Sequence, residues 1–164
     1  LDGNLAHLPL RSQASYTREE LLSALDWRSR DGRPQGSREG VAWCAAHDTD
    51  LFFINLHKDE AVFSPSTMYR DVPVSPTLFD WESQSGTSQA SKTGRRYLNQ
   101  REEGTNVLLT VRNSPNDDVT TAPFTLLGNA DYFSHSGERP IKIRWELRRP
   151  MPTDVLSQAS VLGV

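Results

Sequence analysis

The stretch PIKIRWEL, residues 140–147, gives the clearest structural signal in the sequence. Apolar and charged residues alternate along it, and alternate side chains of a β-strand point to opposite faces of a sheet. One face would carry Ile141, Ile143, Trp145 and Leu147, and the other Lys142, Arg144 and Glu146. The pattern predicts a strand with one side, including Trp145, in a hydrophobic core and the other side charged and exposed.

Other stretches are predicted to be strands because they are short and rich in branched and aromatic residues. They cover residues 41–46, 50–57, 105–112 and 124–135. Gly128, inside the last of them, indicates a bulge or bend. The polar stretches 28–40, 83–94 and 114–123 are predicted to be loops.

A short helix is predicted near the N-terminus. Thr17 and Glu20 have the spacing of a capping box, and an apolar stripe that begins at Leu21 follows, so the helix should cover about residues 17–27. Many strands with one early helix favour an α+β domain, built on a mainly antiparallel curved sheet or a partly closed β-barrel.

The length of 164 residues fits one domain. We expect a lead-in over residues 1–15, a globular domain over 16–152 and a tail over 153–164. No apolar run is long enough to cross a bilayer, so we expect no membrane partner. The single cysteine, Cys44, fits the reducing cytoplasm and is expected to be a small buried residue. Because the chain starts at Leu1 and not at methionine, we expect it to be part of a longer protein.

The net charge of -3 argues against a generally basic nucleic-acid binder, but the charge is unevenly distributed. Residues 87–112 contain five basic and two acidic residues, and residues 138–149 have the same balance, so each segment has a net charge of +3. A local basic face on an acidic chain can hold a phosphate backbone. The alternative is that both segments are ordinary solvated surface.

Catalytic motifs are absent. The sequence lacks a Walker loop, GxGxxG, GxSxG and HExxH, and its histidines lack metal-ligand spacing. We therefore expect no catalytic residue, no metal site and no cofactor in this domain. A weaker alternative is a metal-dependent nuclease that uses Asp71, Asp80 and Glu82, although no lysine element of the usual type follows them.

The run FSPSTMYRDVPVSPTLFDWESQ, residues 63–84, mixes aromatic rings with carboxylates and amides and is interrupted by prolines. Flat apolar faces beside a few polar groups are typical of a binding pocket. The alternative is a buried turn whose polar groups bind the backbone. The residues expected to line the pocket are Tyr69, Asp71, Phe79, Asp80, Trp81 and Gln84.

Several long motifs resemble a known bacterial family of unknown function. They are REGVAWC, TDLFFINLHK, FSPSTMYRDVPVSPTLFDWESQS, TGRRYLN, NVLLTVR, DYFSHSGERPIKIRWEL and PMP, and the resemblance covers about residues 16–152. That family lies at the C-terminal end of superfamily-two helicases, often with a phospholipase-D-type nuclease, and beside HNH endonucleases. The resemblance implies a DNA-binding module of a restriction or phage-defence protein, with a helicase or nuclease domain of the same chain as its neighbour.

One form of such a module is a barrel that reads modified duplex DNA by stacking an extruded base on aromatic rings. Trp81 or Tyr69 would stack, and Asp71 or Asp80 would read a base edge. Phosphates would be held by Arg70, Ser83, Ser85, Lys92, Arg95, Arg96, Arg139 and Arg144.

The competing hypothesis is a structural appendage that docks onto a helicase or nuclease body. The aromatic residues would then form a protein interface, because Trp, Tyr and Arg are enriched at interface hot spots.

Overall fold

The structure is a computed structural model that describes residues 1–29, 40–56, 71–113 and 122–157. Its strands are β1 (Ser15–Tyr16), β2 (Val41–Cys44), β3 (Thr49–Asn55), β4 (Val72–Pro73), β5 (Leu78–Glu82), β6 (Asn106–Arg112), β7 (Phe124–Ser136) and β8 (Lys142–Leu147). Its helices are α1 (Arg18–Ala24), α2 (Lys92–Leu98) and α3 (Gln100–Glu103), with short 3-10 turns η1 (Gly3–Leu5) and η2 (Ala45–His47). Residues 153–157 are also helical.

The strands form one eight-stranded sheet in the order β2-β3-β6-β7-β8-β5-β4, and β1 pairs with the start of β7. β3 and β6 run parallel, whereas the other neighbouring strands are antiparallel. The predicted α+β class with a mainly antiparallel curved sheet is confirmed. The sheet is open, with β2 and β4 at its ends, and it does not close into a barrel.

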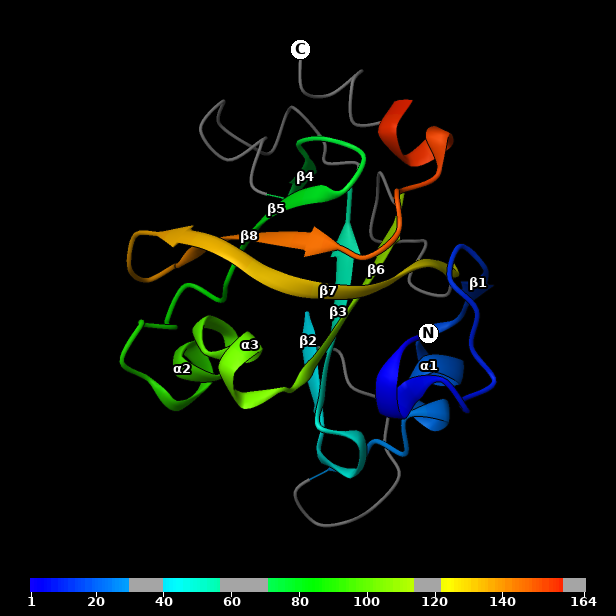
Figure 1. The fold of residues 1–164 in the computed structure, drawn as a ribbon, viewed down its shortest axis with the longest axis horizontal. Coiled ribbons are helices and arrows are strands. Elements are labelled where there is room, and N and C mark those ends of the chain that lie inside the picture. The colour runs from blue at the N-terminus through cyan, green and yellow to red at the C-terminus, as the bar shows by residue number, and fades with distance from the viewer. Residues whose placement is uncertain (30–39, 57–70, 114–121, 158–164) are drawn as a thin grey trace.

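The sheet separates two hydrophobic clusters. β3 contributes to both, because Phe52 and Ile54 face one cluster while Leu51 and Phe53 face the other. Burial on both faces explains why this strand is apolar at successive positions. α2 packs its Tyr97 into the first cluster, and α1 packs its leucines into the second. Figure 1 accordingly shows α1 and the α2–α3 pair on opposite sides of the central strands.

The strand predicted from PIKIRWEL is confirmed. Trp145 is fully buried, and its ring contacts Phe52 at a centroid distance of 5.4 Å. Phe52 also contacts Trp81 at 4.6 Å and Tyr97 at 5.8 Å. The first cluster is therefore centred on a group of aromatic rings contributed by β3, β5, β8 and α2.

Two local predictions are also confirmed. The Thr17 hydroxyl accepts the Glu20 N–H at 3.1 Å, and the Glu20 carboxylate accepts the Thr17 N–H at 2.8 Å, which completes the capping box of α1. Gly128 has a φ of 103° beside a register shift in the β6–β7 pairing. A side chain at this bulge would collide with Ser12, whose Oγ would lie 2.7 Å from the added Cβ.

The sequence did not predict α2 and α3. Residues 83–94 were expected to form a loop, but α2 begins at Lys92, inside that stretch. Ser91 caps the helix, because its hydroxyl accepts the Gly94 N–H at 3.0 Å. Most residues of the other predicted loops, 30–39 and 114–121, lie outside the described part of the chain.

Cys44 is buried, as expected. Burial, together with the negative charge of Asp50, raises the pKa of its thiol to about 12. The thiol is therefore neutral at physiological pH and is a poor nucleophile. Among the described residues, no helix is both long and apolar enough to span a membrane.

Candidate nucleic-acid interface

The two described rings of the expected pocket lie in the hydrophobic core. Phe79 is fully buried and Trp81 is 6% exposed. β5 pairs with β8 so that Phe79 lies opposite Trp145, and side chains at paired positions share a face of the sheet. Phe79 was expected to line the pocket, and Trp81 was one of two rings expected to stack on a base. The alternation of β5 turns both rings toward the core instead.

The carboxylates of this run bind other parts of the protein. An Asp71 oxygen accepts the Glu82 N–H at 3.0 Å, which fixes the chain beside β5. Asp80 accepts two hydrogen bonds from the Arg144 guanidinium, at 2.7 and 3.0 Å. The described residues include no group of three His, Cys, Asp or Glu side chains placed to hold a metal ion.

Gln84 also has partners within the protein. Its side-chain amide lies 3.4 Å from the Tyr97 hydroxyl, and its Oε1 accepts the Thr87 hydroxyl at 3.2 Å. Tyr69 and Arg70 lie outside the described residues. The described members of the expected pocket thus take part in contacts within the protein.

The charged face of β8 is paired at each position. Each outward side chain of β8 lies near an opposite charge from β5 or α3. Arg148, which follows β8, lies near an opposite charge from β7. The pairs are Lys142–Glu82 (3.9 Å), Arg144–Asp80 (2.7 Å), Glu146–Arg101 (3.2 Å) and Arg148–Asp131 (3.1 Å). The hydrogen bonds to Asp80 raise the pKa of Arg144. The structure does not support Arg144 as a phosphate ligand, because its charge is already matched.

Arg96 is the second predicted phosphate ligand with a carboxylate partner. Its Nε and one terminal nitrogen both donate to Asp50, each at 2.8 Å. The Asp50 side chain is 1% exposed and the Arg96 side chain 17%. Burial raises the pKa of Asp50, and Arg96 offsets only part of this rise. The guanidinium also lies 4.5 Å from the centroid of the Trp43 ring. Arg96 therefore attaches α2 to β3 and is not available to bind phosphate.

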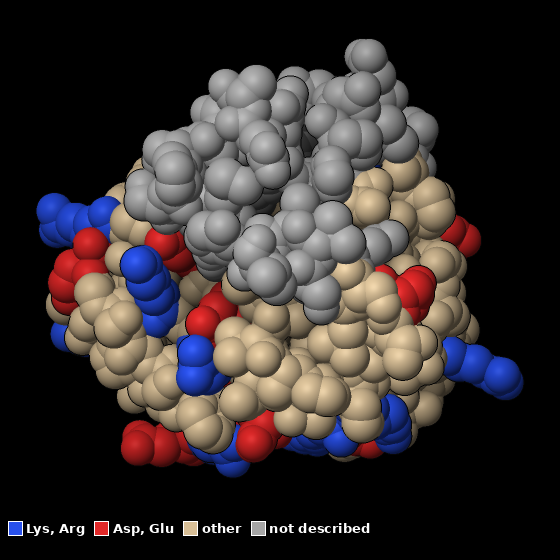
Figure 2. Space-filling view, turned by 90° about the horizontal axis from the view of Figure 1, so that it is seen from above, with Lys and Arg blue, Asp and Glu red and all other residues tan. Residues whose placement is uncertain are grey.

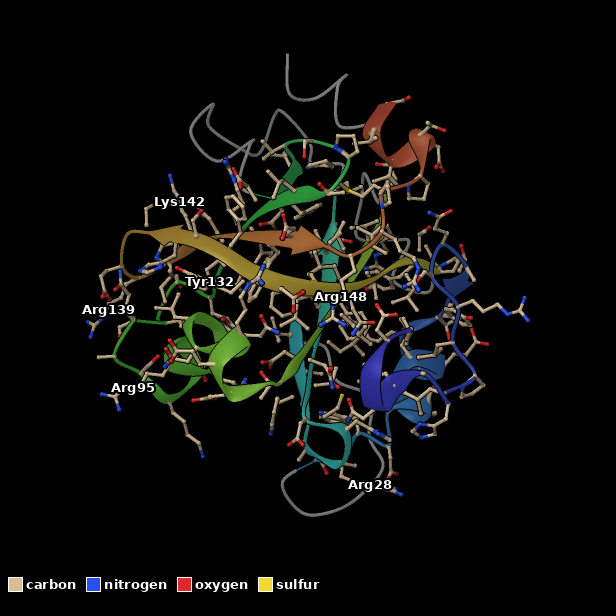
Figure 3. The ribbon with its side chains drawn as sticks, in the orientation of Figure 1. Arg28, Arg95, Tyr132, Arg139, Lys142 and Arg148 are labelled. Atoms are coloured by element: carbon tan, nitrogen blue, oxygen red, sulfur yellow. The ribbon has the colours of Figure 1, made fainter. Side chains whose placement is uncertain are left out.

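Three predicted phosphate ligands remain exposed: Lys92 and Arg95 on α2, and Arg139 in the turn between β7 and β8. None of the three has an acidic partner among the described residues. We call this set the cationic edge. Figure 3 shows Arg95 and Arg139 at the same end of the molecule, with their side chains directed outward.

Hydrogen bonds join the two segments of the cationic edge. The Gln89 N–H donates to the Glu138 carboxylate at 3.1 Å, and the Gln89 side chain donates to the Gly137 carbonyl at 2.9 Å. The Arg139 N–H donates to the Thr87 carbonyl at 3.2 Å. The loop that leads into α2 is therefore fixed against the β7–β8 turn, about 50 residues away in the sequence.

The predicted serine ligands differ in exposure. Ser83 is buried, and its hydroxyl accepts the Ile141 N–H at 2.9 Å and donates to the Gln84 carbonyl at 3.1 Å. It is a structural link between β5 and the start of β8. Ser85 is exposed and lies on the loop that precedes α2. Only Ser85 is therefore placed to meet a ligand.

The surface at this end carries charges of both signs. In Figure 2, basic side chains project at the left of the view, and acidic side chains lie between them. Glu138 is one of the acidic residues of the β7–β8 turn, and its carboxylate is already bound by Gln89. The end is therefore not a uniformly positive surface, and its unpaired cations are individual contact points.

A model of the family described as "Domain of unknown function (DUF3427)" matches residues 10–159. The chain belongs to this family. The match includes the whole of the predicted globular domain, residues 16–152. The comparison with curated proteins gives no match.

One exposed residue of this family member was missed by the sequence prediction. Phe133 is 49% exposed on β7, whereas Trp81, Phe79 and Trp145 are buried. The stretch 124–135 was predicted to be a strand because it is rich in branched and aromatic residues, but the buried part of β7 ends at Ala130. The polar run that begins at Ser134 was the available signal, because a buried strand does not end in several polar residues.

Proposed function

We propose that this domain binds duplex DNA through the cationic edge and catalyses no reaction itself. The observation that carries the proposal is that Lys92, Arg95 and Arg139 are exposed, lack acidic partners in the described chain, and come from two segments joined by hydrogen bonds. Cations that are not neutralised by the protein can replace the counterions of a phosphate backbone.

The fixed geometry of the edge favours a rigid ligand. Two hydrogen bonds from Gln89 and one from the Arg139 backbone hold the α2 loop and the β7–β8 turn together before any ligand arrives. Because the backbone that carries the cations is already fixed, binding has to order only their side chains and costs less conformational entropy than ordering the loops as well. A duplex has regularly spaced phosphates and is a suitable partner for such a set. The exposed hydroxyl of Ser85 is available for a neutral phosphate contact.

The proposal does not include an aromatic pocket, because Phe79 and Trp81 are core residues. Any preference for modified DNA would have to come from another exposed surface. The resemblance to helicase- and nuclease-associated domains supports a role as the DNA-binding module of a restriction or phage-defence protein. In that role the domain would hold DNA for a helicase or nuclease domain of the same chain.

The test is fluorescence anisotropy with labelled duplexes at several salt concentrations. Unmodified, methylated, hydroxymethylated and phosphorothioated duplexes should bind with similar salt dependence, because backbone contacts do not depend on base identity. The double variant Arg95→Glu/Arg139→Glu should bind all of them at least tenfold more weakly. The slope of log affinity against log salt should fall by roughly 2, at about 0.9 per lost contact.

The matched control is Arg11→Glu/Arg28→Glu. Both arginines are exposed, and the double reversal changes the net charge by the same amount. Arg28 differs from Arg95 and Arg139 in that it pairs with Asp26 at 2.7 Å, so the variant controls for overall charge. Arg28 lies far from Arg95 and Arg139 in Figure 3. This control should retain most of the affinity of the unmodified protein. Equal losses of DNA affinity in the two double variants would show that overall charge, and not the cationic edge, determines binding. Absence of salt-dependent DNA binding would contradict the proposal and leave docking onto a protein partner as the explanation.

A further inference from the structure

The outer part of β7 combines an exposed aromatic ring with an unpaired strand edge. Beyond Ala130, β7 pairs with β8 on one side, and no described strand pairs with its other side. Phe133, Ser134, His135 and Ser136 are all exposed. An edge of this kind offers unpaired backbone donors and acceptors to another molecule.

The beginning of this edge is held firmly. The Tyr132 N–H donates to the Gln100 side chain at 2.7 Å, and Arg101 donates to the Tyr132 carbonyl at 2.6 Å. α3 thus occupies the edge at Tyr132, and the loop before α2 binds the chain again at Gly137. Between these two contacts, residues 133–136 have no described strand partner on this side. The Tyr132 hydroxyl also lies 2.5 Å from Nδ1 of His135. The register of β7 shifts between Tyr132 and Ser134, and such a shift redirects the side chain at the irregular position.

The free edge is close to the cationic edge. Phe133 lies three residues before the end of β7 at Ser136, which is about 10 Å at roughly 3.3 Å per residue. The β7–β8 turn that follows contains Arg139. A duplex whose phosphates contact Arg139 would therefore present a groove within reach of Phe133.

The dimensions favour the major groove. A sheet with its side chains is about 10 Å thick. The major groove of B-DNA is about 12 Å wide and the minor groove about 6 Å, so only the major groove can accept a sheet edge without deformation of the DNA. In the major groove, a phenylalanine side chain finds an apolar partner in the C5-methyl group of thymine. A 5-methylcytosine presents a methyl group at the same ring position.

We propose that the free edge of β7, residues 133–136, enters the major groove of duplex DNA, and that Phe133 contacts the C5-methyl groups of pyrimidines. This inference rests on the proposed DNA-binding function, to which it adds a base-contacting residue and a chemical preference. Ser134 and Ser136 pair with Arg144 and Lys142 and lie on the charged face, and His135 pairs with Ile143 and lies on the other face. Their exposed side chains add hydrogen-bonding groups on both sides of this edge.

The experiment compares duplexes that contain thymine with the same duplexes in which deoxyuridine replaces thymine. Removal of the methyl groups should weaken binding by the unmodified protein about fivefold. Phe133→Ala should weaken binding to the thymine duplex by a similar factor and should no longer distinguish the two duplexes. Phe133→Leu retains an apolar side chain and should keep most of the preference. The salt slope should not change in either variant, because neither loses a charge.

Val74→Ala is the matched control, since Val74 is the other large exposed apolar residue of the described chain. It should leave affinity and methyl preference unchanged. Two failures can be told apart. If the unmodified protein binds neither duplex, the proposed function fails. If it binds both equally, or if Phe133→Ala keeps the thymine preference while remaining folded, the assignment of Phe133 is overturned and DNA binding through the cationic edge stands.

Discussion

Arg95 and Arg96 are neighbours on α2 but differ in environment. The Arg95 side chain is exposed and has no acidic partner among the described residues, whereas Arg96 is held by Asp50 beneath the helix. Successive residues of an α-helix are about 100° apart around its axis, so one points to solvent while the other points to the sheet. A count of basic residues treats the two as equal, but only one is available to a ligand.

The aromatic residues show the same division. Trp81 is buried in β5 and Phe133 is half exposed on β7. The sequence prediction placed Trp81 in a binding pocket and Phe133 within a predicted strand, and in the structure Trp81 is the core residue and Phe133 the exposed one. Buried and exposed members of each pair provide matched variants that separate stability from binding.

Trp81→Ala should have the largest effect on stability. The ring packs against Phe52 and Tyr97 at centroid distances of 4.6 and 5.5 Å, so its removal leaves a cavity in the aromatic cluster. The free energy of unfolding, measured by denaturant titration, should fall by about 3–5 kcal/mol. Phe133→Ala should change it by no more than about 0.5 kcal/mol. A fully stable Trp81→Ala protein that had lost DNA binding would restore the pocket hypothesis.

Arg96→Ala should have the next largest effect. The substitution leaves the Asp50 carboxylate buried without its partner, and this should cost about 3 kcal/mol, the lower end of the range because Arg96 is 17% exposed. Arg95→Ala is the control and should cost less than about 0.5 kcal/mol. Similar costs in the two variants would show that the environments of the two arginines do not differ as described.

The loss of stability caused by Arg96→Ala should also depend on pH. Burial already raises the pKa of Asp50, and loss of Arg96 raises it further. A carboxyl group whose pKa is raised on folding destabilises the protein when it is ionised, and this penalty disappears below its unfolded pKa of about 3.9. The variant should therefore approach the unmodified protein in stability as the pH falls from 7 toward 4. A constant deficit over this range would exclude an unpaired Asp50 as its cause.

Much of the fold could be predicted because its signals are local. The strand at 140–147, the capping box at Thr17 and the bulge at Gly128 each depend on a few adjacent residues. β5 was missed although Phe79 and Trp81 alternate with Asp80 and Glu82 as apolar and charged residues do in β8. The prolines before them favoured an interpretation as an interrupted pocket lining or a buried turn, but proline is tolerated in an edge strand such as β4, which ends at Pro73.

The candidate site was less predictable because its composition depends on distant partners. Asp50 and Arg96 are 46 residues apart in sequence, and Asp80 and Arg144 are 64 apart. Sequence spacing gives no indication that these groups meet. The exposed residues of the cationic edge could be identified only once the structure showed which predicted phosphate ligands pair with carboxylates.

Asp131→Asn should destabilise the protein less than Arg96→Ala, and only at pH values where Asp131 is ionised. Burial would raise the pKa of Asp131, but hydrogen bonds from Arg148 and Gln100, with the charges of Arg148 and Arg101, lower it overall. A carboxyl group with a lowered pKa stabilises the fold above its unfolded pKa of about 3.9, and this contribution is lost as the pH falls through the folded value. The variant should be less stable than the unmodified protein at pH 7, and the difference should vanish in acid. Thermal unfolding from pH 7 to 3 measures this, and an equal deficit at every pH would contradict the assignment.

The smallest and most specific expected effect is a difference in DNA binding between Arg139→Ala and Arg144→Ala. Arg139 lacks an acidic partner among the described residues, so its loss should reduce the salt slope of DNA binding by about 1 and weaken binding to all duplexes alike. The charge of Arg144 is balanced by the Asp80 carboxylate, to which it donates two hydrogen bonds. Its loss should therefore leave the salt slope of DNA binding nearly unchanged. The double variant Asp80→Ala/Arg144→Ala removes the pair together and should also keep the slope of the unmodified protein. If Arg144→Ala reduced the slope as much as Arg139→Ala, pairing with Asp80 would not prevent phosphate contact, and the interface would have to extend across the charged face of β8.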